Sequence, residues 1–238
     1  MHIVHHLKIN GWILFLKNKK MKSYNKIPYH NMGPFGEQCY AFDKLDGSNI
    51  RCEWSRKRGW YKFGTRNVMI DERSENFGDV VTLFLDKYGD DLNRIFRKKY
   101  PNTDSFIVFS EYYGQNSFAG YHFDEPKDVV LFDVNAYKRG FIPPREFIKE
   151  FGELHIPELV YQGPYNDELI INVRNNVWDL KEGVICKGTA RVKNGDQVWM
   201  TKIKTNDWLT MVKDKYGMKC LLEEFNMDRN LLEEFINS

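Results

Sequence analysis

The stretch Ala41-Phe42-Asp43-Lys44-Leu45-Asp46-Gly47-Ser48-Asn49 decides how the rest of the chain is interpreted. At its centre stand a lysine, one spacer residue and the pair Asp46-Gly47, with a strand-like run on each side. Asp-Gly is a strong tight-turn dipeptide, because glycine tolerates positive φ. The pattern therefore predicts a hairpin that presents the amine of Lys44 at a strand end. Taken alone, a lysine beside a turn is most often simply solvated.

Composition predicts a globular chain with one substantial core. Its 238 residues are 42% apolar and 15% aromatic, and the mean hydropathy is −0.57. The net charge of +2 does not indicate a polyanionic partner, so a nucleic-acid site has to come from local clustering of charge. The four cysteines show no C-x-x-C spacing, and Cys39, Cys52 and Cys186 lie in strand-like patterns. We expect buried thiols and a reducing compartment.

The first 20 residues differ from the rest. Their apolar run, Trp12-Ile13-Leu14-Phe15-Leu16, is far shorter than the roughly 20 residues that span a bilayer. Lysines follow this run, whereas in a signal peptide the positive charges come first. We expect residues 1–20 to be an extension outside the fold. We also expect no membrane association and a cytoplasmic location, which for a phage or viral protein is the host cytoplasm.

Alternation and turn signals predict an antiparallel β framework. Residues 38–43, a run in which Ile50, Cys52 and Trp54 alternate with polar residues, and residues 60–65 predict an opening meander of three strands. Further strands are expected at 105–113, 129–137, 182–187 and 198–204, the last two joined by a hairpin at Asn194-Gly195.

Helical spacing appears in the segments between these strands and after them. Apolar residues recur every three or four positions over 75–99, where Gly89 is expected to break the run into two helices. Pro143-Pro144 opens a helix that ends at Phe151, and another is expected over 166–180. From Asn206 onward the pattern predicts short helices. The predicted class is α+β, with a domain over 21–204 and a short helical tail over 205–238.

Five further features follow Lys44 in chain order. They are Phe63-Gly64-Thr65-Arg66-Asn67, then Phe109-Ser110-Glu111-Tyr112-Tyr113-Gly114, Leu131-Phe132-Asp133, Glu182-Gly183-Val184-Ile185-Cys186-Lys187 and Lys202-Ile203-Lys204. Most of them place a charged residue at or near a predicted strand end, whereas Leu131-Phe132-Asp133 lies within the strand predicted over 129–137. Lys202 and Lys204 stand two residues apart and are therefore expected on one face of their strand.

This ordered set resembles the covalent nucleotidyltransferase superfamily of ATP-dependent ligases and mRNA capping enzymes. It is most similar to the RNA ligases of the bacteriophage RNA ligase 2 type, and the resemblance covers about residues 38–204. Each motif is weak evidence alone, but their common order at domain-scale spacing is strong evidence. The resemblance implies a nucleotidyltransferase (ATP-grasp-like ligase) domain of antiparallel sheets flanked by helices.

The resemblance also implies a role for each motif. Lys44 is the nucleophile that becomes adenylylated, and Asp46 and Gly47 complete its motif. Lys202 and Lys204 contact the α-phosphate, Glu182 lies near a Mg²⁺ or Mn²⁺ ion, and Lys187 belongs to the same motif as Glu182. Glu111 contacts the ribose, Phe132 stacks on adenine, and Arg66 engages the ribose or the 3′-hydroxyl end. The implied substrates are ATP and RNA ends or nicks, handled by a monomer.

The chemistry explains why such residues are needed. A free lysine is protonated at neutral pH, and attack on phosphorus requires its neutral form. Neighbouring cations disfavour the charged form, so we expect Lys187, Lys202, Lys204 and a divalent metal ion to lower the pKa of Lys44. The basic run Arg56-Lys57-Arg58, between Trp54 and Trp60, is a candidate contact for a nucleic-acid backbone.

Plainer interpretations stay open for most of these residues. Glu182 and Lys187 could form a surface ion pair, Lys202 and Lys204 could mark a solvated sheet edge, and Phe132 could belong to the core. The run 56–58 could be a solvated turn. Alternative functions are a DNA ligase, a capping-type guanylyltransferase, and a nucleic-acid-binding relative without turnover. The short tail bears on nick recognition more than on self-adenylylation.

Overall fold

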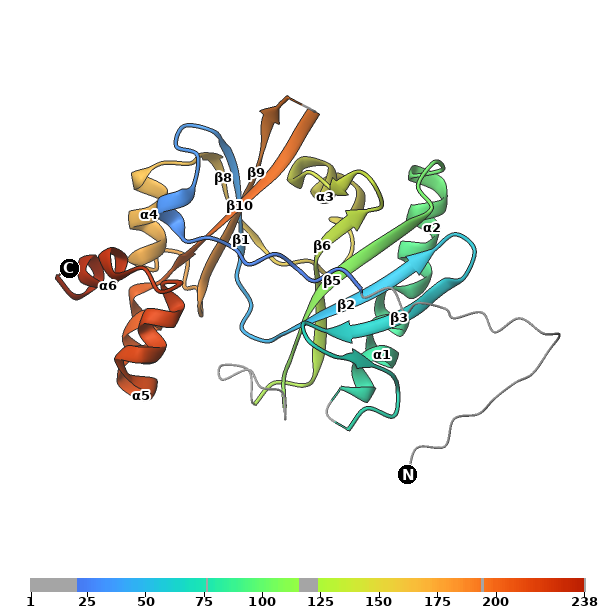
Figure 1. The fold of residues 1–238 in the computed structure, drawn as a ribbon, viewed down its shortest axis with the longest axis horizontal. Helices are drawn as coiled ribbons and strands as arrows, with labels where there is room; N and C mark the ends of the chain where they lie inside the picture. Colours follow the sequence, from blue (N-terminus) through green and yellow to red (C-terminus); the bar gives the residue numbers. More distant parts are fainter. Residues whose placement is uncertain (1–20, 76, 116–123, 194, 238) are drawn as a thin grey trace, which may run out of the picture.

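Two antiparallel sheets form the framework, and the chain passes from one to the other directly after Lys44 (Figure 1). The computed structural model describes residues 21–75, 77–115, 124–193 and 195–237. The four-stranded sheet has the order β10 (Gly195–Lys204), β9 (Gly183–Val192), β1 (Gln38–Asp43), β8 (Leu159–Pro164). The six-stranded sheet has the order β4 (Met69–Ile70), β3 (Gly59–Thr65), β2 (Ser48–Ser55), β5 (Ser105–Tyr113), β6 (Asp128–Ala136), β7 (Gly140–Phe141). The predicted α+β class with antiparallel sheets and flanking helices is confirmed.

The predicted hairpin at Asp46-Gly47 is wrong, and of the predicted opening meander only the pairing of β2 with β3 is confirmed. β1 pairs with β8 and β9, whereas β2 pairs with β3 and β5, so the two strands lie in different sheets. Glycine is required at position 47 because of a close approach between backbones, and not because of a positive φ. A Cβ atom at this position would lie 2.6 Å from the carbonyl oxygen of Tyr112, because the connection runs closely against β5. The Lys44 turn is therefore a crossing between sheets.

Gly89 does not break the helical segment that covers the six-stranded sheet. α1 (Gly78–Phe84) continues through a π-helical turn, Leu85–Gly89, into α2 (Asp90–Lys99), and Gly89 itself has helical φ and ψ of −52° and −51°. The carbonyl of Gly89 accepts a hydrogen bond of 3.0 Å from the indole nitrogen of Trp60. The continuous apolar stripe packs on the sheet and outweighs the low helix propensity of one glycine.

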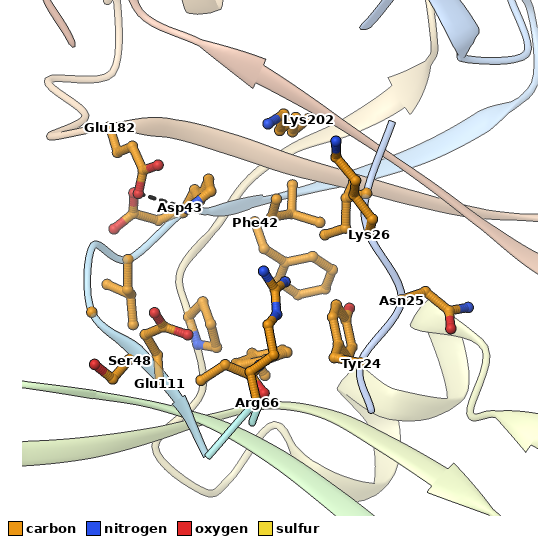
Figure 2. A pocket seen from close by; sticks show the side chains of 18 of the residues that line it. Tyr24, Asn25, Lys26, Phe42, Asp43, Ser48, Arg66, Glu111, Glu182 and Lys202 are labelled. Atoms are coloured by element: carbon orange, nitrogen blue, oxygen red, sulfur yellow. Dashed lines mark hydrogen bonds and ion pairs between the residues drawn. The ribbon is translucent and has the colours of Figure 1, made fainter. Parts of the chain in front are cut away.

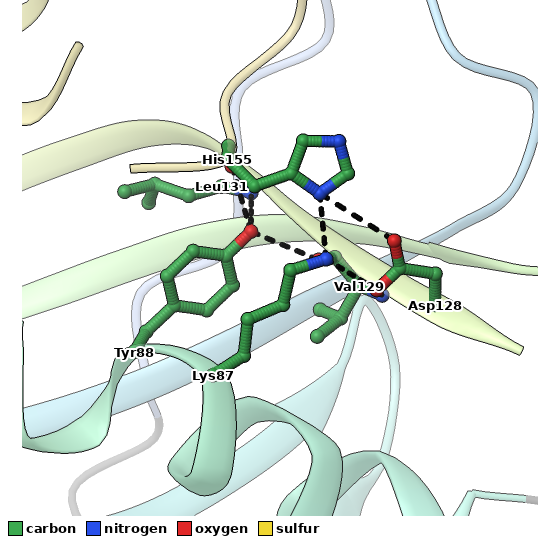
Figure 3. Close-up of polar contacts among 6 residues, drawn as sticks. All are labelled: Lys87, Tyr88, Asp128, Val129, Leu131 and His155. Atoms are coloured by element: carbon green, nitrogen blue, oxygen red, sulfur yellow. Dashed lines mark hydrogen bonds and ion pairs between the residues drawn. The ribbon is translucent and has the colours of Figure 1, made fainter. Parts of the chain in front are cut away.

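Side chains of the π-helical turn bind the first residues of β6 (Figure 3). The hydroxyl of Tyr88 lies 2.6 Å from the carbonyl oxygen of His155 and 2.9 Å from that of Val129. Lys87 forms an ion pair with Asp128, and its Nζ lies 2.6 Å from Nδ1 of His155. The segment that leads from α3 (Pro144–Phe151) to β8 is thereby anchored to the helical layer.

Two elements of the four-stranded sheet differ from the sequence predictions. α4 covers only Asp167–Arg174, and Asn176 and Asp179 beyond it have left-handed φ of 56° and 55°. The edge strand β8 was not predicted, because its half-exposed residues show no clear alternation and end in Gly163-Pro164. Its pairing with β1 places β1 in the interior of the sheet. Tertiary pairing thus overrides a weak local signal.

The helical tail follows β10 directly and packs around Tyr29. α5 spans Asn206–Glu224 with a break at Gly217, where φ is 82°, and α6 spans Arg229–Asn237. Thr205 caps α5 by accepting a hydrogen bond from the backbone nitrogen of Trp208. The tail contributes Trp208, Leu221, Phe225 and Leu231 to a small core of its own around Tyr29.

The segment from Met21 to Tyr29 crosses from one sheet to the other. The Arg51 guanidinium in β2 donates to the carbonyl oxygen of Met21 at 2.8 Å. At the far end, the backbone nitrogen of Lys202 in β10 donates to the carbonyl oxygen of Pro28 at 2.9 Å. This crossing segment thereby ties β2 to β10, and residues 22–27 between the two anchors connect the sheets.

Two bulk predictions can be checked directly. Cys39, Cys52 and Cys186 are buried free thiols, as expected, and Cys220 is partly exposed. Among the residues that the structure describes, no helix is long and apolar enough to cross a membrane. The expected extension, residues 1–20, lies outside the described residues.

Candidate active site

A cavity of about 550 Å³ lies between the two sheets, and side chains from both sheets line it (Figure 2). Most of the residues singled out from the sequence line it: Lys44, Gly47, Arg66, Glu111, Phe132, Glu182, Lys187, Lys202 and Lys204. Its volume falls within the roughly 300–1,000 Å³ typical of small-molecule sites. The structure therefore brings residues from positions 44 to 204 to one hollow.

Strand register explains how Lys44, Glu182 and Lys204 meet. In β9, Val184 pairs with Asp43 of β1, and Gly183 pairs with Lys204 of β10. The backbone nitrogen of Lys44 donates to the carbonyl oxygen of Gly183 at 2.9 Å. Three adjacent strands thus reach the cavity at the same level, so that residues far apart in sequence become neighbours.

Gly183 makes this close arrangement possible. Its φ is 145°, and a Cβ atom there would lie 2.1 Å from the carbonyl oxygen of Ile203. Only glycine fits such a close approach of backbone to backbone. Lys202 and Lys204 both line the cavity, as their spacing predicts, whereas Ile203 between them is buried in the core on the opposite face.

Glu182 binds two lysines at the base of the cavity. Its Oε2 lies 2.7 Å from Nζ of Lys44, and its Oε1 forms an ion pair with Lys204. The side chain of Glu182 is 4% exposed and that of Lys44 is 25% exposed. Since a buried carboxylate is stable only when its charge is compensated, the two ammonium groups hold Glu182 ionised. Accordingly, the pKa of Glu182 is lowered, because Lys44 and Lys204 outweigh the opposing effect of burial.

The pKa of Lys44 is raised, not lowered. Burial favours the neutral amine, but the negative charges of Glu182 and Glu111 outweigh burial. The expectation that the neighbouring lysines lower the pKa of Lys44 is therefore wrong, and the part of the expectation that concerns a divalent ion stays a prediction. Sequence alone did not indicate that Glu182 is the nearest charged group. In this arrangement Lys44 carries a proton and has a carboxylate within hydrogen-bond distance to receive it.

Two other groups in the cavity have pKa values shifted toward neutrality. Burial and the nearby charges of Glu182 and Asp46 raise the pKa of Glu111 to about 8, although Lys44 opposes the shift. Burial and the charge of Lys204 lower the pKa of Lys202 to about 8. Both groups therefore exchange protons close to physiological pH. Arg66, in the loop after β3, faces the same cavity and is exposed.

A second buried ion pair lies on the aromatic side of the cavity. Nζ of Lys187 is 2.9 Å from Oδ2 of Asp133 and 2.7 Å from the carbonyl oxygen of Phe132. The Tyr24 hydroxyl also binds Asp133, and the Tyr24 ring meets the Phe132 ring edge-on at 5.2 Å. The suggested pairing of Glu182 with Lys187 is thus not made, because each has a different partner. Phe132 is half-buried and keeps a surface in the cavity.

Four of the sequence candidates lie outside the cavity lining. Asp46 is absent from it, although its charge acts on Glu111. Arg56, Lys57 and Arg58 form the turn between β2 and β3, at the opposite end of β2 from Ser48 (Figure 1). Arg56 donates to the carbonyl oxygen of Tyr100 at 2.9 Å, at the end of α2. The structure does not bring this basic turn to the cavity.

From the sequence, no role was predicted for Tyr24, Asp133 or Glu224. A charged residue inside the apolar strand around Val129-Val130-Leu131-Phe132 was the available signal for Asp133, since an isolated buried aspartate is rare. Tyr24 comes from an extended segment, and Glu224 from the end of α5; neither has a local pattern that marks it. Glu224 lies 3.0 Å from Nζ of Lys204.

The polar groups of the cavity suit a nucleotide accompanied by a divalent ion better than a metal bound by protein alone. Among the described residues, no group of three or more His, Cys, Asp or Glu side chains is placed to hold a metal. Mg²⁺ is typically held by one or two carboxylates together with phosphates and water. Glu182 fits that pattern, and the buried Oδ1 of Asn49 finds no hydrogen-bond partner in the described part of the chain. Glu182 is therefore the candidate protein ligand.

Comparisons with known proteins agree with this geometry. The RNA ligase family model matches residues 37–204. An archaeal ATP-dependent RNA ligase has a similar fold, with a TM-score of 0.58, 14% identity, and coverage of 91% of this chain and 62% of that one. A *Naegleria gruberi* RNA ligase solved with pyrophosphate also has a TM-score of 0.58, with 16% identity and coverage of 82% and 58%. No curated protein sequence matches.

These similarities differ in what they establish. At 14–16% identity, the solved structures show a shared fold, and the chain spans about three fifths of their length. The family model, in contrast, covers more than half of the chain, from the start of β1 to the last lysine of β10. The chain therefore belongs to the RNA ligase family.

Proposed function

We propose that this protein seals RNA ends with ATP through a covalent lysyl-AMP intermediate on Lys44. The observation that carries the proposal is the contact of Lys44 with Glu182 at 2.7 Å, beside Lys204 in a cavity of about 550 Å³. This arrangement combines a nucleophile, a base for its proton and a cation for the phosphate. The solved *Naegleria* ligases include complexes with ATP and manganese and with AMP and manganese, which supports ATP as the substrate.

In the first step, Nζ of Lys44 forms a bond to the α-phosphorus of ATP. The bond from that phosphorus to the bridging oxygen breaks, and its electron pair leaves with pyrophosphate. Lys44 must first lose a proton, and the Glu182 carboxylate is the nearest acceptor. Lys202 and Lys204 then offset the negative charge on the phosphate oxygens. A divalent ion bound near Glu182 would further neutralise the triphosphate.

The remaining residues position the nucleotide. Phe132 offers a ring face for stacking on adenine, and the Lys187–Asp133 pair holds the strand from which that ring projects. Glu111 is placed to accept or donate a hydrogen bond at the ribose, since its pKa of about 8 leaves it largely neutral at pH 7. Arg66 at the exposed rim suits the ribose or the acceptor end.

Two transfers complete the reaction. The 5′-phosphate of an RNA end attacks the lysyl-bound AMP, and the nitrogen–phosphorus bond breaks to release Lys44. The 3′-hydroxyl of the other end then attacks the activated 5′-phosphate, and AMP leaves. We propose that Lys57 and Arg58 contribute to binding the RNA backbone away from the cavity, because Arg56 already binds the end of α2.

The test is a sealing assay on nicked duplexes that differ only in the sugar at the nick. We expect joining of an RNA nick with ATP, and no joining by a Lys44→Ala variant. Joining of DNA alone would indicate a DNA ligase instead. Labelling of the protein by α-labelled GTP, but not by ATP, would indicate a capping-type enzyme. Absence of label with either nucleotide would indicate a non-catalytic relative.

Three finer expectations stay predictions. These are a monomeric state, a cytoplasmic location and membership of the phage RNA ligase 2 type within the family. Sedimentation at several protein concentrations checks the first of them. A mass that rises with concentration would contradict it.

A further inference from the structure

Lys204 is bound by two carboxylates, and the second comes from the helical tail. Besides Glu182, Nζ of Lys204 contacts Oε2 of Glu224 at 3.0 Å. The indole ring of Trp208 covers the same ammonium group, with 4.7 Å between Nζ and the ring centroid. The side chain of Lys204 is only 3% exposed. Two carboxylates and one aromatic ring therefore contact its ammonium group.

Several contacts of the tail hold Glu224 beside Lys204. Glu224 is the last residue of α5, and Glu223, Glu224 and Asn226 all line the cavity. Asn226 and Met227 have left-handed φ of 57° and 68°, which turns the chain sharply after the helix. The side-chain amide of Asn226 donates to the carbonyl oxygen of Ile27 in the crossing segment at 3.4 Å. The buried ring of Phe225 packs on Tyr29, with centroids 5.1 Å apart.

The position of Glu224 at the end of α5 is unfavourable for two reasons. A carboxylate at the C-terminal end of a helix faces the negative end of the helix dipole, which is unfavourable. Two non-glycine residues in left-handed conformations add strain beside it. The compensating interaction at Glu224 is its pairing with Lys204.

An α-phosphate can reach Lys204 only if one of the two carboxylates gives way. Glu182 is 4% exposed and also binds Lys44, so its displacement would break two buried ion pairs. Glu224 is 31% exposed and, among the described residues, forms its ion pair with Lys204 only, so water can solvate it once it leaves. Glu224 is therefore the easier carboxylate to displace.

We propose that Glu224 is a positioning residue that occupies Lys204 until the α-phosphate of the nucleotide replaces it. The inference rests on the proposed function, because it takes Lys204 as a phosphate ligand. Nucleotide binding and docking of the α5–α6 turn then compete for one ammonium group. Binding of ATP releases the turn at residues 223–228, and release of the nucleotide allows it to dock again. The tail thereby responds to occupancy of the cavity.

The first test compares the kinetics of lysyl-AMP formation in the wild-type chain, Glu224→Gln, Glu224→Asp and Glu233→Gln. Glu233, an exposed residue of α6, provides the same change of charge within the tail. Loss of a competing, partly exposed ion pair should lower the KM for ATP roughly three- to tenfold in Glu224→Gln, with kcat changed less than about twofold. Glu224→Asp should restore most of the wild-type KM. An unchanged or higher KM in Glu224→Gln overturns the inference.

The second test follows hydrogen exchange of the amides at 221–228 in a Lys44→Ala background, where ATP stays unreacted. With Glu224 present, ATP should accelerate exchange several-fold. In the double variant with Glu224→Gln, exchange should already be fast and should not respond. Unchanged or slower exchange on ATP binding in the Lys44→Ala variant overturns the inference, even when the wild-type chain forms lysyl-AMP normally. A wild-type chain that neither forms lysyl-AMP nor binds ATP overturns the proposed function and this inference together.

Discussion

Nζ of Lys44 lies 2.7 Å from Oε2 of Glu182, so the lysine that suits the role of nucleophile is held as an ammonium ion. This ion pair has two consequences for the site. It keeps a buried carboxylate ionised, and it places a proton acceptor beside the amine that has to lose a proton before attack. In the free protein the cavity therefore holds Lys44 in its protonated form, and Lys44 has to lose this proton before it can attack phosphorus.

Replacing Glu182 by glutamine should slow lysyl-AMP formation by about 100-fold or more, the usual effect of removing a positioned base. The amide cannot take the proton from Lys44, and it leaves Lys44 and Lys204 without their shared counter-charge. Rapid-quench measurement of protein-bound label checks the rate, with Glu153→Gln as an exposed control. A rate within about threefold of the wild-type rate would contradict the role given to Glu182.

Replacing Asp133 by asparagine should lower the free energy of unfolding by about 3–5 kcal/mol. The change leaves the ammonium of Lys187, 5% exposed, without a charged partner in the interior. The double variant Asp133→Asn/Lys187→Met removes both charges and should recover a large part of the loss. Urea unfolding of the three proteins gives the comparison. A double variant less stable than Asp133→Asn would show that the pair does not act as a unit.

Stability should fall as the pH drops from about 6.5 to about 4, because of His30. Burial and the charge of Arg174 lower the pKa of this imidazole from 6.5 to about 4. The unfolded chain therefore binds a proton in this interval that the folded chain does not. Each pH unit costs up to about 1.4 kcal/mol from this group.

The variant His30→Gln isolates the contribution of His30. Its side-chain amide can place an acceptor near the position of Nε2, which lies 3.2 Å from the guanidinium of Arg174, but it does not titrate. Urea unfolding between pH 4 and pH 7 should give a shallower slope for the variant. Parallel slopes for the two proteins would rule out His30 as the source of the pH dependence.

Replacing Gly183 by alanine should disrupt the strand ends that carry the site. The new Cβ atom would meet the carbonyl oxygen of Ile203 at 2.1 Å and displace β10, and with it Lys204. Gly140 also has positive φ, at 87°, but has open space around it. Gly140→Ala should therefore cost about 1–3 kcal/mol from backbone strain alone. Gly183→Ala should cost more and abolish lysyl-AMP formation; equal effects in both variants would contradict the packing argument.

The meeting of Lys44, Glu182 and Lys204 could be predicted because their motifs stand at strand ends and follow a recognisable order. Alternation also predicted that Lys202 and Lys204 share a face. The sequence-based predictions were wrong where long-range strand pairing overrides local signals. The Asp46-Gly47 dipeptide has the composition of a hairpin, but β1 finds its partners in β8 and β9.

The charge state of the site could not be predicted from the sequence. The pKa of Lys44 depends on which charged group lies nearest, and that is set by the register of β1, β9 and β10. Likewise, Tyr24 and Glu224 come from segments without regular alternation, and their contacts exist only once the crossing segment and the tail have packed. Sequence patterns identify Lys44 as the candidate nucleophile, whereas its protonation state follows from the tertiary structure.

The most direct test of the central claim is to map the site of adenylylation. The purified chain is incubated with ATP and a divalent ion, digested, and examined by mass spectrometry for a peptide carrying one AMP. The account predicts a single acid-labile AMP on Lys44, lost in Lys44→Ala and released from the wild-type chain by pyrophosphate. An AMP on Lys187, Lys202 or Lys204, or a Lys44→Ala chain that still acquires AMP, would contradict it.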